Sequence, residues 1–173
     1  MIKIDKILFP SDLTAYSTAG LEYALTLSRL YDAKLYILHI LDTSMFEEIT
    51  GNIPETDEMY LSLEENKRIE MNKYIRENLK ENSKVFQALK FGKVSDEIIK
   101  FAEDENIDLI IMEETGLRSK ESSAFMGTVE KVITGTNISV LNINGLSTET
   151  KPHYSSLADS KLQLNTFGRA LFN

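Results

Sequence analysis

The sequence predicts an α/β fold with a doubly wound, five-stranded parallel sheet and helices on both faces. Five short apolar runs recur along the chain, and each has the length of a strand. Segments with apolar residues at helical spacing separate these runs. Strands that alternate with helices pair in parallel through right-handed crossovers, so helices come to lie on both sides of one sheet.

The five apolar runs are rich in Ile, Leu and Val, which favour strands. They span residues 4–9, 34–41, 85–90, 108–112 and 139–143. Two of them show almost no alternation of apolar and polar residues. This pattern is typical of a strand that is covered on both faces, as the central strands of a parallel sheet are.

Four segments have the spacing of amphipathic helices: residues 14–31, 57–82, 95–105 and 127–136. The apolar face of the first comprises Leu21, Ala24, Leu25 and Ser28. The apolar positions of the second, which lie among charged residues, are Leu61, Ile69, Tyr74, Ile75 and Leu79. The segment between the second strand and the second helix, residues 42–56, is expected to form a loop over one end of the sheet.

Small polar residues and glycine mark the expected starts of three helices. We expect Asp12 or Thr14 to cap the first helix and Ser95 to cap the third. The fourth helix is expected to begin at Gly127. Its first turn would then offer unpaired backbone N–H groups, with the Thr128 hydroxyl beside them.

Composition and charge exclude several classes of function. The net charge is -8, from 19 basic and 27 acidic residues, whereas nucleic acids and anionic membranes require a concentration of Lys and Arg. The chain has no cysteine and two histidines, so we expect no disulfide, thiolate metal site, cysteine nucleophile or histidine-rich metal site. A small anionic ligand stays possible because it needs only one local site.

The chain divides into a domain of residues 1–145 and a C-terminal extension of residues 146–173. The start lacks the apolar core of a signal peptide, and the longest apolar stretch is far shorter than a membrane span. We therefore expect a cytoplasmic protein. The extension is too apolar for a simple solvated tail, and its larger apolar residues include Leu157, Leu162, Leu164, Phe167, Leu171 and Phe172.

The ligand site is expected beyond the carboxyl ends of the strands, where open parallel sheets bind ligands. Pro10, Ser11 and Asp12 follow the first strand, and residues 40–43 end and follow the second. After the fourth strand, residues 113–128 include Gly116, Arg118, Lys120, Gly127 and Thr128. This loop is neither a Walker A loop nor a dinucleotide fingerprint, so on this evidence alone a surface connection with a helix cap is the preferred interpretation.

Five segments stand in a recognisable order: KILFPSDLTAYS, LYILHILD, FGKVSDEIIKFAEDENIDLIIM, GTVEKVI and SVLNI. In this order and spacing they resemble the universal stress protein family, over the stretch from about Ile2 to Asn144. The resemblance implies the strand order 3-2-1-4-5. It also implies a homodimer that pairs through the fifth strand, from Ser139 to Ile143, since an apolar edge strand needs cover.

Many members of that family bind ATP through a loop of the form G-x-x-G, nine residues, then G-S/T. The resemblance assigns the Asp after the first strand to Asp12 and the apolar contact at the end of the second to Ile40. It assigns the later glycines of the loop to Gly116 and Gly127. The implied site for ATP, with Mg²⁺, comprises Pro10, Asp12, Ile40, Met112, Gly116, Gly127 and Thr128.

The loop departs from the family pattern at two points. Glu113 replaces the first glycine, and ten residues rather than nine separate Gly116 from Gly127. A carboxylate about 4 Å from a phosphate charge costs about 1 kcal/mol in water and about 4 kcal/mol at an intermediate dielectric. A helix N-terminus returns only about 0.3–2 kcal/mol. We therefore expect Glu113 to oppose ATP binding unless Arg118, Lys120 or magnesium offsets its charge.

Three functions follow as hypotheses. The first is a non-enzymatic, dimeric binding and signalling protein, with or without bound ATP. The second is a weak ATP hydrolase, although no candidate base is positioned by a partner residue. The third is a protein that acts through its C-terminal extension and an unknown protein partner. We expect His39 to be a buried, hydrogen-bonded side chain and the acidic residues Glu47, Glu48, Asp57 and Glu58 to be solvated rather than to bind a metal.

Overall fold

The computed structural model describes residues 3–14, 17–43, 58–79, 84–114 and 123–144. The strands are β1 (Lys6–Pro10), β2 (Lys34–Leu41), β3 (Val85–Phe91), β4 (Leu109–Glu114) and β5 (Ser139–Asn144). The helices are α1 (Thr18–Tyr31), α3 (Glu58–Asn78), α4 (Val94–Asp104) and α5 (Ser123–Gly135). Strands and helices therefore alternate along the chain as the sequence predicts.

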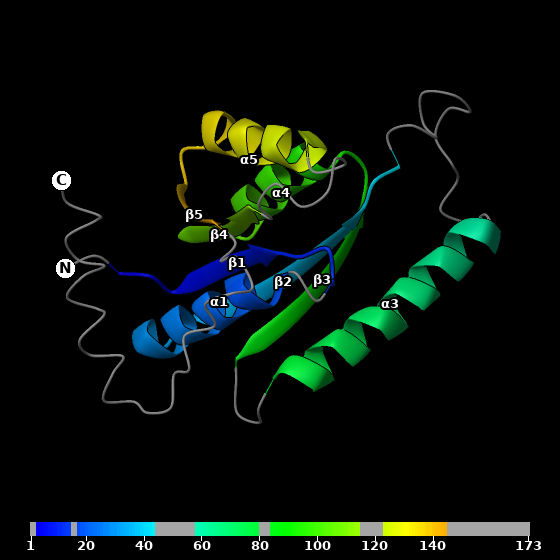
Figure 1. Cartoon of the computed structure of the whole chain (residues 1–173), viewed down its shortest axis with the longest axis horizontal. Coiled ribbons are helices and arrows are strands. Elements are labelled where there is room, and N and C mark those ends of the chain that lie inside the picture. Colours follow the sequence, from blue (N-terminus) through cyan, green and yellow to red (C-terminus); the bar gives the residue numbers. More distant parts are fainter. Residues whose placement is uncertain (1–2, 15–16, 44–57, 80–83, 115–122, 145–173) are drawn as a thin grey trace.

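The five strands form one sheet in the order β3-β2-β1-β4-β5. Each neighbouring pair is parallel. Figure 1 shows α1 and α3 on one side of this sheet and α4 and α5 on the other. The doubly wound sheet and the strand order 3-2-1-4-5 are thus confirmed. The expected loop at residues 42–56 and the C-terminal extension lie almost entirely outside the described residues.

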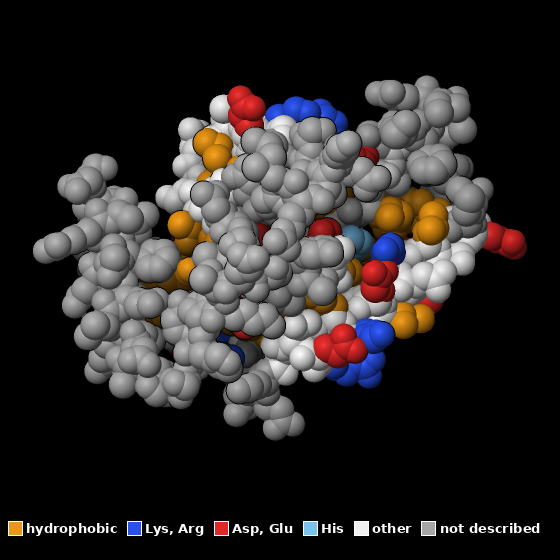
Figure 2. All heavy atoms as spheres, in the orientation of Figure 1, with side chains coloured by type: hydrophobic (Ala, Val, Ile, Leu, Met, Phe, Trp, Pro, Cys, Tyr) orange, Lys and Arg blue, Asp and Glu red, His pale blue; other side chains and the backbone are white. Residues whose placement is uncertain are grey.

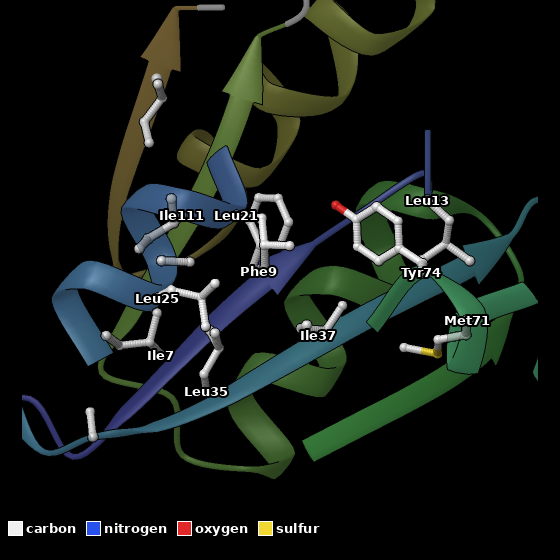
Figure 3. Close-up of a cluster of buried hydrophobic side chains, with 13 residues drawn as sticks. Ile7, Phe9, Leu13, Leu21, Leu25, Leu35, Ile37, Met71, Tyr74 and Ile111 are labelled. Carbon is white, nitrogen blue, oxygen red and sulfur yellow. The ribbon is translucent and has the colours of Figure 1, made fainter. Parts of the chain in front are cut away.

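The core consists of two clusters, one on each face of the sheet. The first lies under α1 and α3 and contains Ile7, Phe9, Leu21 and Ile111 (Figure 3). The second lies under α4 and α5 and contains Leu8, Ile98 and Ile110 among others. Because successive side chains of a strand point to opposite faces, β1 contributes Ile7 and Phe9 to one cluster and Leu8 to the other. All three are fully buried.

The apolar face predicted for α1 is confirmed, but the caps are not. Leu21, Ala24, Leu25 and Ser28 are all buried. The helix begins at Thr18 after Ser17, and neither Asp12 nor Thr14 caps it. Asp12 instead accepts hydrogen bonds from the Thr14 N–H and hydroxyl, at 2.9 and 2.8 Å, within the turn before the helix. Local hydrogen bonds of this kind compete with capping.

The starts of two other helices also differ from the prediction. Lys93, not Ser95, is the N-cap of α4, and Ser95 lies inside the first turn. The helix α5 begins at Ser123, four residues before Gly127. A single glycine inside a helix costs only about 1 kcal/mol, so Gly127 does not have to mark a helix start. Gly127 and Thr128 therefore lie inside α5, beyond the four N–H groups that a helix start leaves free.

The helix α3 buries part of the expected set, and Ile75 and Leu79 pack, partly buried, against the first cluster. Tyr74 is buried as predicted, and Met71 joins it, but Leu61 and Ile69 are about half exposed. Ion pairs such as Lys67–Glu70 and Arg68–Glu64 run along its solvent side. Figure 2 shows acidic and basic side chains mixed over this part of the surface. Charged neighbours three and four residues away support an exposed helix face.

Replacement of Ile110 by alanine tests the core cluster between the sheet and helices α4 and α5. The side chain is fully buried in the second cluster, so Ile110→Ala is expected to lower the free energy of unfolding by about 2–5 kcal/mol. Leu61→Ala, on the exposed side of α3, is the matched control and should change it by about 0.5 kcal/mol or less. Urea unfolding of the two variants provides the comparison, and equal losses would contradict the proposed core.

Candidate functional site

A strained turn presents Asp12 at the carboxyl edge of the sheet. The Ser11 N–H donates to the Leu38 carbonyl at 2.9 Å and so extends the pairing of β1 with β2. Leu13 then adopts a left-handed backbone with φ of 62°, which typically costs about 1–3 kcal/mol outside glycine. Burial of the Leu13 side chain and a 3.0 Å bond from its N–H to Ser11 Oγ oppose that cost. Asp12 remains exposed.

The predicted apolar contacts lie on the side of the sheet that faces α4 and α5. Met112 belongs to the second cluster and is fully buried, and Ile40 packs against the same cluster and is partly buried. Pro10 follows Leu8 by two residues on β1, so it faces the same side. Gly127 and Thr128, on α5, are also partly buried. Gly116 lies outside the described residues, as do Arg118 and Lys120.

Glu113 points to the opposite side of the sheet from Met112. Its side chain is 5 % exposed. Its Oε2 accepts a 2.8 Å hydrogen bond from the N–H of Gly20, in the first turn of α1. The carboxylate therefore satisfies one of the four donors that a helix start leaves free, and it lies at the positive end of the helix dipole. The charge that we expected to face a phosphate on the loop instead caps α1 from β4.

The pKa of the Glu113 carboxyl is raised above its ordinary value of 4.5. Burial is the largest cause, and the nearby negative charge of Asp12 also raises it. The hydrogen bond from Gly20 lowers the pKa but does not offset the loss of water. Glu113 is thus a buried carboxyl whose proton is held more tightly in the folded chain than in the unfolded chain.

A chain of buried hydroxyl groups connects the turn after β1 with the start of α1 and with α3. Ser17 Oγ lies 3.1 Å from Ser11 Oγ and 3.0 Å from the Tyr74 hydroxyl. His39 Nδ1 donates to the Ser11 carbonyl at 2.8 Å, since a carbonyl oxygen only accepts. The expected packed and hydrogen-bonded histidine is therefore observed. Its Nε2 is buried without a partner among the described residues. Burial lowers the pKa of His39 below 6.5.

These contacts include residues that the sequence analysis did not select. Gly20 lies in none of the segments that carry the family resemblance. Ser17 ends the first of those segments without an assigned role, and Tyr74 was expected only as an apolar position of its helix. The one available signal was a glycine inside a helical pattern, which often marks a close approach. Its partner Glu113 is 93 positions away, so the reason for that glycine is visible only in the folded chain. The part of the chain that the structure describes holds no cluster of metal-ligating side chains, and residues 44–57 lie outside it.

The close approach of α1 to β4 predicts that alanine substitutions at two helical glycines have opposite effects on stability. A Cβ at Gly20 would lie 2.8 Å from Glu113 Oε2 and 2.8 Å from Phe9 Cε2, whereas a Cβ at Gly127 would meet nothing within 4 Å. Gly20→Ala should therefore destabilise the fold by about 1–3 kcal/mol. Gly127→Ala should stabilise it by about 0.5–1 kcal/mol. Urea midpoints measure both, and a stabilised Gly20 variant would refute the contact.

The buried carboxyl predicts a distinctive pH dependence. Because its folded pKa is raised, Glu113 contributes stability at low pH that is lost as the pH rises from about 4.5 through the folded pKa. Glu113→Gln keeps an oxygen acceptor for Gly20 and removes this titration. The free energy of unfolding of the variant should therefore increase relative to that of the parent as the pH rises across this window.

Comparing the parent with Glu113→Gln separates the effect of Glu113 from that of His39. The lowered pKa of His39 reduces stability as the pH falls below 6.5. That titration is common to both chains and cancels in the difference. Urea unfolding at a series of pH values measures the difference directly. A difference that is constant with pH, or that shrinks as the pH rises, would contradict the assignment.

Comparisons with known proteins agree with this architecture. The chain matches the model of the universal stress protein family over residues 3–144. It is 28% identical over 150 residues to universal stress protein MJ0577 of Methanocaldococcus jannaschii, covering 79% of this chain and 92% of that protein. It is 26% identical over 137 residues to universal stress protein MJ0531 of the same organism, covering 79% of each.

Solved structures with the same fold include that of MJ0577, with a TM-score of 0.68 at 25% identity over 85% of this chain and all of the other. A universal stress protein in complex with cAMP has a TM-score of 0.56 at 12% identity, over 83% of this chain and 99% of the other. One from Archaeoglobus fulgidus in complex with dAMP has 0.55 at 17% identity, over the same shares.

The family model covers the whole sheet and all the described helices, from before β1 to the end of β5. The residues of the extension lie beyond it. This protein belongs to the universal stress protein family.

Proposed function

We propose that this protein binds an adenine nucleotide at the carboxyl edge of the sheet and acts by binding rather than by catalysis. ATP with Mg²⁺ is the candidate ligand. The observation that carries the proposal is Asp12, an exposed carboxylate held by a buried, strained turn beside the ends of β2 and β4. The related proteins bound to cAMP and dAMP support a nucleotide as the ligand class.

The orientation of Glu113 supports the proposal of an anionic ligand. Its carboxylate bonds to the start of α1, on the side of the sheet away from Ile40 and Met112. A ligand that contacts Ile40 would therefore approach from the face of the sheet opposite to this carboxylate. The proposal uses the whole predicted set, Pro10, Asp12, Ile40, Met112, Gly116, Gly127 and Thr128. Because Met112 is fully buried, its role would be to shape the floor of the site.

Calorimetric titration with Mg-ATP tests the site. Asp12→Ala is expected to weaken binding by about tenfold or more, because a hydrogen bond to a charged group contributes about 1.5–3 kcal/mol. Asp104→Ala, which removes an exposed carboxylate of α4, is the matched control and should bind as the parent does. Equal affinities of the two variants, or no binding by the parent, would refute the proposed site.

Glu113→Gln separates two accounts of the replaced glycine. If the carboxylate serves α1, the variant should bind Mg-ATP about as tightly as the parent does. If the charge faces the phosphates, removing it should strengthen binding by about fivefold or more, because the repulsion between carboxylate and phosphate costs at least about 1 kcal/mol. The glutamine variant is preferable to Glu113→Gly here because it keeps an acceptor for the Gly20 N–H. Tighter binding by the variant would contradict the orientation described above.

Assembly through β5 is the second part of the proposal. β5 is an edge of the sheet, and an unprotected edge strand needs cover or a partner strand. We propose that residues 139–143 pair with those of a second copy to form a homodimer. Sedimentation should give twice the chain mass, and Val140→Lys should reduce it toward the monomer. A monomeric parent would refute this part and leave the nucleotide site standing.

Weak ATP hydrolysis is the alternative activity, and phosphate release measures it. Among the described residues, Glu113 accepts from the Gly20 N–H, and the unpaired Nε2 of His39 is buried. Both side chains are less than a tenth exposed, so neither is presented to a ligand at the edge of the sheet. We therefore expect release no faster than in Asp12→Ala. If the parent fails to bind ATP at all, action through the extension and a protein partner becomes the favoured alternative.

A further inference from the structure

The face of the sheet under α1 and α3 is unevenly covered. α1 packs mainly on β1, β4 and β2, and α3 packs on β3 at the other edge (Figure 1). On this face β5 presents Leu141 and Ile143, and Leu141 is only partly buried. Helical cover therefore thins between α1 and β5, where a sheet of this kind needs an apolar layer.

The side of α1 that faces β5 is apolar. Gly20 contacts Glu113 of β4, and Tyr23, Leu27 and Leu30 follow it by three, seven and ten residues along the same side of the helix. Tyr23 and Leu27 are partly buried, and Leu30 is 51% exposed. With Leu109 and Leu141, which pack against the same core cluster, these three residues form what we call the α1–β5 strip.

The extension carries a complementary surface in its sequence. Leu157, Leu164, Phe167 and Leu171 are spaced by seven, three and four residues, which would place them on one side of a helix. Residues 145–173 contain three basic and two acidic side chains, a charge of +1. The remaining residues carry -9, since the whole chain has -8. A slightly basic, amphipathic segment thus follows a strongly acidic domain.

The length of the extension and its point of attachment also match the α1–β5 strip. A helix of residues 157–171 would be about 22 Å long, and the 14 residues of α1 span about 21 Å. The extension starts at the end of β5, which forms one wall of the α1–β5 strip. Residues 145–156 can span about 40 Å when extended, which is enough to reach either end of α1. The segment and the α1–β5 strip are therefore matched in size as well as in chemistry.

We propose that the C-terminal extension of each chain docks, through the face formed by Leu157, Leu164, Phe167 and Leu171, on the α1–β5 strip of the same chain. It would act as an additional helix on the α1 face and leave the backbone edge of β5 free. The inference is independent of the nucleotide site, because it uses neither Asp12 nor the α5 face of the sheet.

The cysteine-free chain allows a direct test by cross-linking. Leu27→Cys is combined with Phe167→Cys in the full chain and treated with a short bis-maleimide. The matched control combines Phe167→Cys with Arg29→Cys, which is exposed on the other side of α1. We expect a link within one chain for the Leu27 pair and little for the Arg29 pair, read by denaturing gel and peptide mass. Equal yields, or links only between chains, would overturn the proposal.

Tryptic cleavage of the full chain at Lys161 gives a second readout that needs no cross-link. Leu164→Asp with Phe167→Asp should expose the extension and speed this cleavage by about tenfold, as expected when an ordered segment opens more often. Asn165→Asp with Thr166→Asp adds the same charge away from the apolar face and should leave the rate unchanged. Equal rates for the two variants and the parent would also overturn the proposal.

Discussion

The burial of β1 on both faces is the constraint on which the rest of this structure depends. Ile7, Leu8 and Phe9 are all fully buried, and no single layer of helices can bury side chains that point in opposite directions. At roughly 1.5–3 kcal/mol for each large apolar side chain, the strand demands one helical layer on each side. The alternation of strands and helices along the chain supplies both layers, and right-handed crossovers distribute them.

The same constraint determines where the proposed site lies. A central strand that is fully enclosed must end in a turn at the edge of the sheet, where its neighbours β2 and β4 also end. The turn at residues 11–14 is built from buried Ser11 and Leu13, and it leaves Asp12 exposed. Backbone strain at Leu13 is tolerated because its surroundings are buried and hydrogen-bonded. The turn therefore presents a carboxylate at the edge of the sheet where the nucleotide site is proposed.

Glu113 serves the fold through its contact with α1. The family resemblance implies a glycine at this position. Here the side chain crosses to the α1 face and binds the N–H of Gly20, which must itself lack a Cβ for the two elements to meet. Glu113 and Gly20 are therefore a coupled pair. The cost of burying the carboxyl appears as its raised pKa, and the hydrogen bond to a helix start partly offsets that cost.

The fold class, the five strands, the apolar face of α1 and the position of Asp12 at a strand end are all predictable from the sequence alone. These features follow from local periodicity, which reports burial directly. The strand order came from the family resemblance and was confirmed. Tertiary contacts decided the rest. The start of α5 at Ser123, the exposure of Leu61 and Ile69, and the direction of Glu113 depend on which surfaces meet. A carboxylate on β4 and a helix N–H that lies 93 positions away in the sequence become partners only when the sheet brings them together, because local periodicity carries no information about such distant pairs.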